Sequence, residues 1–207
     1  MSHTVICIGR EFGSGGHEIA RRTGSRLGIP VYDEEMLTLA CGLGDVWEEL
    51  LLSEDERPVN PFLFRTMHEG NEKVSRTMPA GHVLYDLQAI VMRRLVKEGD
   101  CIIVGRCADH ILNSEDAELL TVFIHAPLEQ RIQRKMELES LSYAKVKKQV
   151  EKKDRQRRKY YESHTGMEWG SADHYDLMID TGQMTLDEAA DRIAEAYKCS
   201  KKPLSES

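Results

Sequence analysis

Apolar residues along this chain gather in five short runs, and most of these runs are continuously apolar rather than alternating with polar residues. Such runs are typical of strands that are covered on both faces in a parallel sheet. The pattern predicts strands at residues 4–8, 29–32, 101–104, 119–125 and 176–180.

Between these runs the apolar residues recur at helical spacing, as one-sided stripes. Strands that alternate with helices predict an α/β fold, a three-layer sandwich around a five-stranded parallel sheet with right-handed crossovers. The three clearest stripes consist of Val83, Leu87, Ile90, Val91 and Leu95; of Leu128, Ile132 and Met136; and of Leu186, Ala189, Ala190, Ile193 and Ala194.

Two segments do not follow this alternation. Residues 36–81 lean towards helix around a proline-containing break and predict a helical insertion. Residues 141–164 predict a basic helical lid. Two such segments on one core favour a site that closes over its ligands. We expect a single domain over residues 1–207, whose core comprises 1–35, 82–140 and 165–200.

The composition is that of an ordinary globular protein, with 207 residues of which 41% are hydrophobic and 30% charged. No apolar run approaches the roughly 20 residues needed to span a bilayer, and the start of the chain does not resemble a signal peptide. We therefore expect a soluble, cytoplasmic protein without a membrane partner. The five cysteines form no CxxC pair, which favours buried, reduced thiols over a disulfide framework or a zinc site.

The charges are unevenly spread along the chain. A net charge of -7 argues against binding to a nucleic acid polymer. One segment is nevertheless strongly basic, and we expect an anionic ligand to meet it unless it is simply a solvated helix face. Its basic residues are Lys145, Lys147, Lys148, Lys152, Lys153, Arg155, Arg157, Arg158 and Lys159, against only Glu151 and Asp154.

A glycine-rich segment, residues 9–18, joins the first predicted strand to a helix. Glycines let backbone N–H groups converge, and the start of a helix adds partial positive charge, so this order of elements builds an anion cradle. It is the layout of a phosphate-binding loop. The usual signature, however, has a lysine and then a serine or threonine after the last glycine of the turn, where this chain has Gly16, His17 and Glu18.

Several segments, in this order and spacing, resemble the cytidylate kinase-like family, a branch of the nucleoside monophosphate kinases. The matching residues are 10–20, 27–33, 101–109, 111–112, 154–157, 160–161, 169 and 175–181. The resemblance implies ATP-dependent phosphorylation of a nucleoside monophosphate, with CMP or dCMP as the preferred acceptor and Mg²⁺ accompanying ATP. Such a transfer needs two phosphates held in line and their charge neutralised, so cradles and cations should form the site.

The resemblance assigns ATP to the glycine-rich segment. Gly16 stands at the family's lysine position and Glu18 at that of a magnesium-binding threonine, so Glu18 is the candidate Mg²⁺ ligand. The missing cation is either His17, which is only partly charged at neutral pH, or Arg10, which is always charged and which we favour. Alternatively, Arg10 and Glu11 pair on the surface and Glu18 caps the helix. The expected ATP-binding residues are Arg10, Gly13, Ser14, Gly15, Gly16, His17 and Glu18.

The resemblance also implies an acceptor site at the carboxyl ends of the strands, where open α/β sheets bind ligands. Asp33 would lie near the acceptor phosphate and the attacking oxygen, and Arg106 would clamp that phosphate unless it pairs with Asp109. Asp154 and Arg157, on one helix face, would contact the acceptor nucleotide. The expected catalytic residues are Asp33 and Arg106, with Arg155 and Arg158 as lid arginines that close over the phosphoryl group; Tyr160, Tyr161 and Trp169 are expected to pack.

Two other function classes stay open. The missing lysine would suit a nucleotide-binding or regulatory protein that has lost catalysis, although such a protein has no need of Asp33, Arg106 and Arg157 together. A kinase whose acceptor is a small molecule other than a nucleotide is the third possibility.

Overall fold

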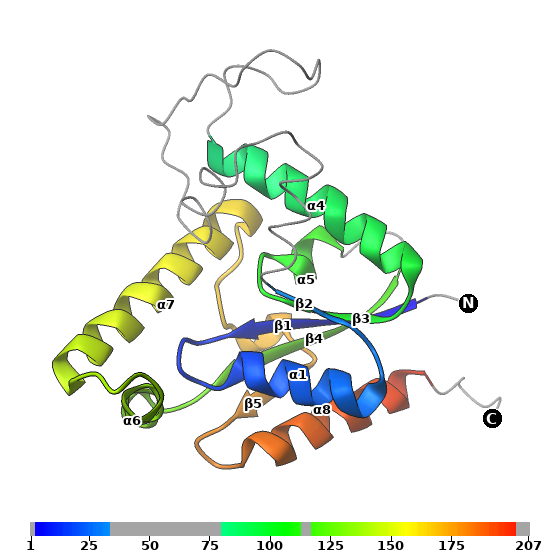
Figure 1. Ribbon diagram of the computed structural model, residues 1–207. Coiled ribbons are helices and arrows are strands. Elements are labelled where there is room, and N and C mark those ends of the chain that lie inside the picture. Colours follow the sequence, from blue (N-terminus) through cyan, green and yellow to red (C-terminus); the bar gives the residue numbers. More distant parts are fainter. Residues whose placement is uncertain (1–2, 34–79, 113–116, 202–207) are drawn as a thin grey trace.

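A five-stranded parallel sheet forms the middle layer of the molecule, in a computed structural model that describes residues 3–33, 80–112 and 117–201 (Figure 1). The strand order is β2-β3-β1-β4-β5. The strands are β1 (His3–Arg10), β2 (Val31–Tyr32), β3 (Cys101–Val104), β4 (Ala117–His125) and β5 (Leu177–Asp180). The predicted α/β sandwich with a five-stranded parallel sheet is confirmed.

The central strand β1 pairs with β3 on one side and with β4 on the other. Its register places Val5 beside Cys101 of β3 and Leu119 of β4. Because the chain crosses to opposite sides of β1 in its two halves, a crevice opens at the carboxyl end of β1. The glycine-rich segment begins at this point.

Helices cover both faces of the sheet, and Figure 1 shows α1 (Gly16–Leu27) and α8 (Leu186–Ser200) together on one of them. The other face carries α4 (Ala80–Glu98) and the short α5 (Ala108–Ile111). Two further helices, α6 (Leu128–Glu139) and α7 (Tyr143–Thr165), pack against each other through Ile132, Val146 and Val150. A 3₁₀ turn, Ala172–His174, precedes β5.

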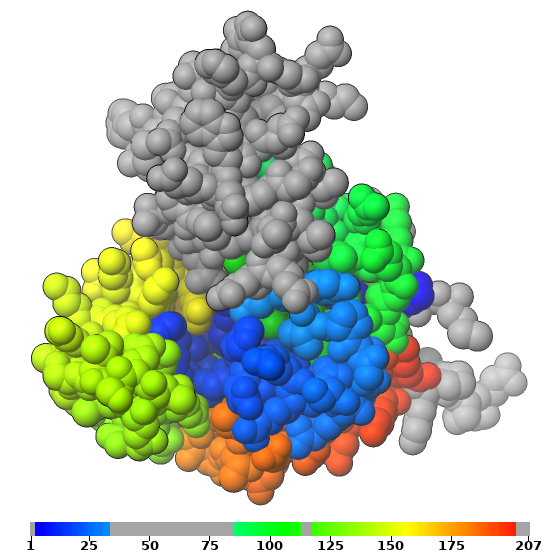
Figure 2. All heavy atoms as spheres, in the orientation of Figure 1, coloured from blue at the N-terminus to red at the C-terminus, as the bar shows by residue number. Residues whose placement is uncertain are grey.

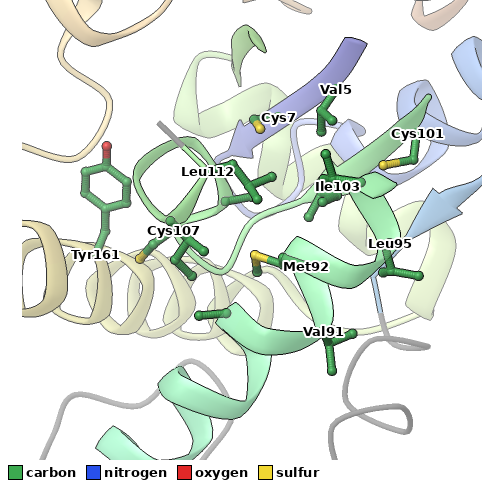
Figure 3. Packing of buried hydrophobic residues seen from close by; sticks show 14 of the residues in the cluster. Val5, Cys7, Val91, Met92, Leu95, Cys101, Ile103, Cys107, Leu112 and Tyr161 are labelled. Carbon is green, nitrogen blue, oxygen red and sulfur yellow. The ribbon is translucent and has the colours of Figure 1, made fainter. Parts of the chain in front are cut away.

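Successive residues of β1 enter different cores, as the continuously apolar run predicts. Ile6 and Ile8 are buried with α1 and α8, whereas Val5 and Cys7 are buried with α4 and α5. Figure 3 shows the second of these cores, in which Met92 of α4 packs near the strands. Burial on both faces explains why alternation is absent from the sequence of this strand.

The predicted bounds are wrong for four strands: β1 and β4 extend beyond them, whereas β2 and β5 begin later than predicted. At the two late starts, hydrogen bonds other than sheet pairing use the backbone. At the start of β2, the Ile29 N–H donates to the Gly24 carbonyl and ends α1, and Pro30 has no N–H to give. At the start of β5, the Asp176 carboxylate accepts hydrogen bonds from the amide and hydroxyl of Thr121, both at 2.8 Å. These residues therefore lie outside the strands.

The stripe predicted for α4 is wrong at Ile90, whose side chain is 54% exposed. Leu87, Val91 and Leu95 are buried as predicted, but the most buried apolar residue of the helix is Met92. Two positions along a helix correspond to a rotation of about 200°, so Ile90 points away when Met92 points inward. The side chain of Val83 lies outside the described residues.

The fold also bears on the expected lid, the expected insertion, the cysteines and membrane-spanning helices. The expected lid, 141–164, coincides with α7, whereas residues 36–79 of the expected insertion lie outside the described residues. Cys7, Cys101 and Cys107 are buried as expected, and burial raises the pKa of the Cys7 and Cys101 thiols. Cys199 is exposed, against expectation, because it lies on the solvent side of α8. Within the described ranges, no helix has the length and apolar character to cross a membrane.

Asp100, just before β3, joins the start of β1 to the end of α8. Its side chain is only 15% exposed and accepts hydrogen bonds from the Thr4 amide at 2.9 Å, the Tyr197 hydroxyl and the Lys201 ammonium. Burial alone would raise the pKa of this carboxyl, but the Lys201, Tyr197 and Thr4 donors outweigh it and lower the pKa to about 2. The folded state therefore favours the charged carboxylate.

We expect Asp100→Asn to lower the free energy of unfolding by about 1–2 kcal/mol at neutral pH, a charge-assisted hydrogen bond discounted for partial exposure. Because the folded pKa lies below the unfolded value of about 3.9, the stabilisation is complete above that value and is lost as pH falls towards 2. Urea unfolding at pH 7 and pH 3 measures both effects. Asp173→Asn, at an exposed position, is the control. An equal loss of stability at the two pH values would contradict this assignment.

Candidate functional site

The glycine-rich loop runs from the end of β1 to the first turn of α1, in the predicted order of strand, loop and helix. Gly13 and Gly15 have left-handed backbones, with φ of 85° and 87°, and Gly15 is the N-cap of α1. Residues with a side chain rarely adopt this conformation. The first N–H groups of α1 have no partner within a helix, so they are suited to hold an anion.

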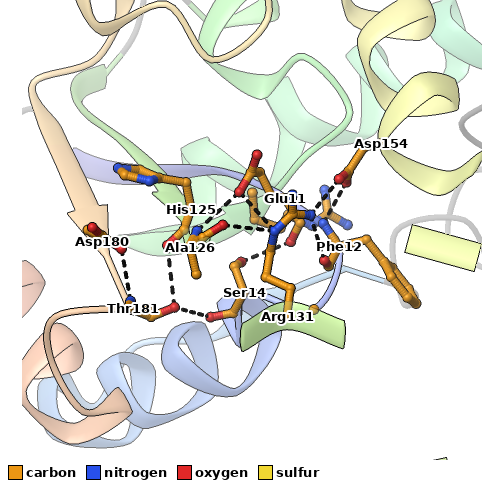
Figure 4. Close-up of polar contacts among 12 residues, drawn as sticks. Glu11, Phe12, Ser14, His125, Ala126, Arg131, Asp154, Asp180 and Thr181 are labelled. Atoms are coloured by element: carbon orange, nitrogen blue, oxygen red, sulfur yellow. Dashed lines mark hydrogen bonds and ion pairs between the residues drawn. The ribbon is translucent and has the colours of Figure 1, made fainter. Parts of the chain in front are cut away.

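Hydrogen bonds donated to its carbonyl groups hold the loop in place. The Ser14 hydroxyl donates to the Glu11 carbonyl at 2.9 Å, and the Thr181 hydroxyl donates to the Ser14 carbonyl at 2.8 Å (Figure 4). Arg134 of α6 donates to the Gly13 carbonyl at 3.1 Å. No pattern in the sequence indicates these roles for Thr181 and Arg134. These bonds fix the carbonyl side of the loop against β5 and α6.

A buried arginine of α6 joins the start of the loop to α7. Arg131 donates to the Ala126 carbonyl at 2.9 Å, to the Phe12 carbonyl at 3.0 Å and to the Asp154 carboxylate at 2.5 Å. Asp154 also accepts from the Phe12 amide at 2.7 Å, and the Glu11 carboxylate lies 3.2 Å from the Arg131 guanidinium (Figure 4). Burial raises the pKa of Glu11, although the Ala126 amide and Arg131 partly oppose this.

The resemblance places Asp154 at the acceptor nucleotide, but its hydrogen bonds in this network lead elsewhere. In the structure both of its carboxylate oxygens face the loop and α6, through Phe12 and Arg131. Contact with an acceptor therefore remains a prediction, and the observed contacts are those of a residue that positions the loop. No pattern in the sequence indicates this role for Arg131.

A pocket opens at the carboxyl ends of β1 and β3, beside the loop. Arg10, Arg106 and Arg157 line it together, although they are far apart in the sequence. Its remaining wall includes four aromatic residues, Tyr160, Tyr161, Trp169 and Tyr175. Tyr160, Tyr161 and Trp169 are also buried in the core, so their predicted packing role is confirmed. The combination of three guanidinium groups with aromatic rings suits an anion that carries a flat or apolar part.

The backbone that presents Arg106 is unusual. Gly105, Arg106 and Cys107 follow β3 with φ of 80°, 58° and 56°, so three successive residues are left-handed. For residues other than glycine this conformation costs about 1–3 kcal/mol, and such strain is concentrated at functional sites. The Arg106 side chain is buried at this position, with the residue only 5% exposed.

Asp109, the alternative partner proposed for Arg106, accepts a hydrogen bond from the Tyr161 hydroxyl at 2.6 Å. Burial raises the pKa of Asp109, and burial together with the Asp109 carboxylate raises the pKa of the Tyr161 hydroxyl. Both residues line the pocket, so this hydrogen bond lies in its wall.

Asp33, just after β2, lies between the loop and the pocket. One carboxylate oxygen is 3.6 Å from an Arg10 guanidinium nitrogen, and the other is 2.9 Å from His17 Nδ1. Arg10 is buried rather than on the surface, so the alternative of a surface pair between Arg10 and Glu11 is wrong. Glu18 does not cap α1: it pairs with Arg22 at 2.9 Å on the exposed side of the helix.

The arginines of α7 point in different directions. Arg157 lines the pocket and donates to the Arg10 carbonyl at 3.3 Å. Arg155 is exposed, and the Arg158 guanidinium lies 5.8 Å from the centre of the Trp169 ring. In Figure 2 the blue N-terminal residues reach the surface between the lime and yellow residues of α6 and α7 and the orange residues near the start of α8. Because neither Arg155 nor Arg158 lines the pocket, their proposed lid role remains a prediction.

Replacing Gly15 with valine tests the loop as an anion site. A Cβ at this position would lie 2.7 Å from Leu186 Cδ2, on a left-handed backbone that a β-branched residue strongly disfavours. We expect the variant to lose ATP binding and about 1–3 kcal/mol of stability.

Gly28→Val is the matched control, because Gly28 ends the same helix with φ of 67° and has open space around a Cβ. It should lose stability but keep parental ATP affinity. Calorimetric titration with ATP measures the difference. Parental affinity in Gly15→Val would exclude the loop as the site.

The strand order, the glycine-rich loop and the arginine-lined pocket together define a P-loop kinase fold. An uncharacterised protein from Eubacterium ventriosum has a similar structure, with a TM-score of 0.70, 24% identity, and coverage of 94% of this chain and 98% of that one. Shikimate kinase from Acinetobacter baumannii, solved in complex with shikimate, has a TM-score of 0.50 at 14% identity and covers 98% and 97% of the two chains. At these identities the similarity concerns the fold.

The chain belongs to the cytidylate kinase-like family, whose model matches residues 5–183. A curated cytidylate kinase from Methanopyrus kandleri is 25% identical over 193 residues, which is 89% of this chain and 88% of that protein. The family resemblance found in the sequence is thereby confirmed. Family and fold support a phosphotransferase that acts on a nucleotide or another small molecule.

Proposed function

We propose that this protein transfers the γ-phosphoryl group of ATP to a nucleoside monophosphate, preferentially CMP or dCMP. The observation that carries the proposal is the pocket beside the glycine-rich loop, in which Arg106, on its left-handed backbone, meets Arg10 and Arg157. An anion-binding loop next to a second anion-binding pocket is what transfer between two phosphates requires.

On the donor side, the ATP phosphates would bind the N–H groups of residues 13–18. The loop is already fastened through its carbonyl groups by Ser14, Thr181 and Arg134, so little reorganisation is needed when phosphate arrives. Preorganised donors of this kind stabilise charge at small cost.

On the acceptor side, Arg106 and Arg157 would hold the monophosphate. Asp33 lies where the loop and the pocket meet, and it would orient the acceptor oxygen towards the donor phosphate. Arg155 and Arg158 would approach only when α7 closes, because neither lines the pocket in the structure. The aromatic side chains of the pocket would exclude water from the reacting groups.

Mg²⁺ is part of the proposal, because it neutralises the phosphates of ATP during transfer. Glu18 fits as a protein ligand because it lies in the first turn of α1 and its side chain is 48% exposed. Its pairing with Arg22 at i and i+4 is worth only about 0.5 kcal/mol at an exposed site, so the carboxylate can be released. Most of the other ligands would be phosphate oxygens and water.

The rival function is a nucleotide-binding protein without catalysis, which the glycine at position 16 favours. A kinase of a non-nucleotide acceptor is also compatible with the family and the fold. A coupled assay of ATP consumption with CMP, dCMP, UMP, AMP and GMP, with and without Mg²⁺, separates these possibilities. We expect turnover with CMP or dCMP. No turnover with any of them, together with ATP binding by calorimetry, would favour the rival functions.

A further inference from the structure

Gly16, where phosphate-binding loops have lysine, has no room for a side chain. A Cβ at Gly16 would lie 2.8 Å from the Cβ and 3.0 Å from the Cγ of Arg10. The backbone at Gly16 is not left-handed, so backbone strain does not exclude a side chain there. The stem of Arg10 therefore occupies the space that a lysine at position 16 would need at its base.

The head of Arg10 reaches the boundary between the loop and the pocket. Its guanidinium passes directly over Gly105, where an added Cβ would overlap it, and lies 3.6 Å from the Asp33 carboxylate. The side chain is 10% exposed and lines the pocket together with Arg106. Two glycines thus make room for one arginine, Gly16 at its stem and Gly105 at its head.

We infer that Arg10 is the catalytic cation of this site and replaces the missing lysine from the end of β1. This inference rests on the proposed function. During transfer an oxygen of the acceptor phosphate bonds to the γ-phosphorus, the bond to the β–γ bridging oxygen breaks, and its electron pair leaves on ADP. Arg10 keeps its proton and shares its charge between the γ-phosphoryl oxygens and the acceptor phosphate.

A catalytic Arg10 explains why this chain has both an arginine at position 10 and a glycine at position 16. An arginine is always charged and can bind two oxygens with its fork of N–H groups, whereas a lysine is a point charge. A guanidinium between donor and acceptor can therefore contact both phosphates at once. With the Arg10 stem in this position, a lysine at position 16 would collide with it.

The test exchanges the two positions in the full chain. Arg10→Met keeps most of the stem and removes the charge, and we expect it to lower kcat/KM for ATP about 30- to 300-fold. Arg10→Gly should lose as much activity, and Gly16→Lys alone should lose activity through its collision with Arg10. The double variant Arg10→Gly/Gly16→Lys, which restores a lysine and vacates its space, should recover at least about tenfold over Arg10→Gly.

ATP binding by calorimetry and thermal unfolding are measured for every variant. Arg94→Met, at an exposed arginine of α4, is the control for loss of a guanidinium. If the parent turns over but Arg10→Met, or Gly16→Lys, retains parental kcat/KM, the inference is overturned while the proposed function stands. A folded double variant no more active than Arg10→Gly also overturns it. A parent that binds no ATP contradicts the proposed function and this inference together.

Discussion

Arg106→Met is expected to lower kcat/KM for the acceptor about 30- to 1,000-fold, which corresponds to about 2–4 kcal/mol of transition-state stabilisation. The Arg106 guanidinium is buried in the pocket, so its charge acts in a medium of low dielectric. The acceptor KM should rise and kcat should fall. ATP affinity should change little, because the expected ATP cradle is formed by other residues.

Steady-state kinetics with varied acceptor, together with calorimetry for ATP, measure the effect. Arg94→Met is again the matched control, and Asp33→Asn gives the contrast, since it should act mainly on kcat. Unfolding curves are needed because Arg106 lies on a strained backbone, although methionine and arginine meet the same constraint at φ 58°. Parental kcat/KM in both Arg106→Met and Asp33→Asn would exclude this pocket as the acceptor site.

Arg131→Met is expected to lower the free energy of unfolding by about 3–5 kcal/mol, the usual cost of removing one partner from a buried ion pair. The change leaves the Asp154 and Glu11 carboxylates without their cation and the Phe12 and Ala126 carbonyls without a donor. Urea unfolding measures the loss. Arg94→Met, whose partner is the exposed Glu98, should lose less than about 0.5 kcal/mol.

The loss of unfolding free energy in Arg131→Met should also depend on pH, in a direction set by the ionisation of Glu11. Burial already raises the pKa of this carboxyl, and removal of Arg131 takes away a contact that lowers it. A carboxyl whose folded pKa exceeds its unfolded value of about 4.3 stabilises the fold below that value, and this contribution is lost as pH rises through the folded pKa. The deficit of Arg131→Met should therefore be smaller at pH 5 than at pH 8. A deficit that grows towards acid pH would contradict this account.

The sequence predicted the sheet and the position of the loop because both depend on local patterns. Continuously apolar runs indicate strands that are buried on both faces, and glycines at left-handed positions indicate the loop. The position of Arg106 at the crevice could be predicted because this residue follows an apolar strand, and the carboxyl ends of the strands face the crevice. The same reasoning located Asp33.

Contacts between distant residues could not be predicted in this way. Arg131 is 119 positions from Phe12, and Thr181 is 167 positions from Ser14. Neither residue belongs to a local pattern that indicates its partner. The direction of the Arg10 side chain was equally hidden, since it depends on the empty space at Gly16 and Gly105. Ile90 was misplaced because periodicity alone does not fix the centre of a buried helix face.

The central place of β1 in the sheet has a consequence for synthesis of the chain. The Thr4 amide bonds to Asp100, 96 positions later, and β3 and β4 follow that residue. At about 5–20 residues per second, a ribosome needs about 6–24 s to go from Thr4 to the end of β4. Throughout that time the nascent chain carries an apolar strand without its partners, a state prone to aggregation. The pairing of β1 on both of its edges can be completed only after β4 has left the ribosome, so the first strand made must wait for its neighbours.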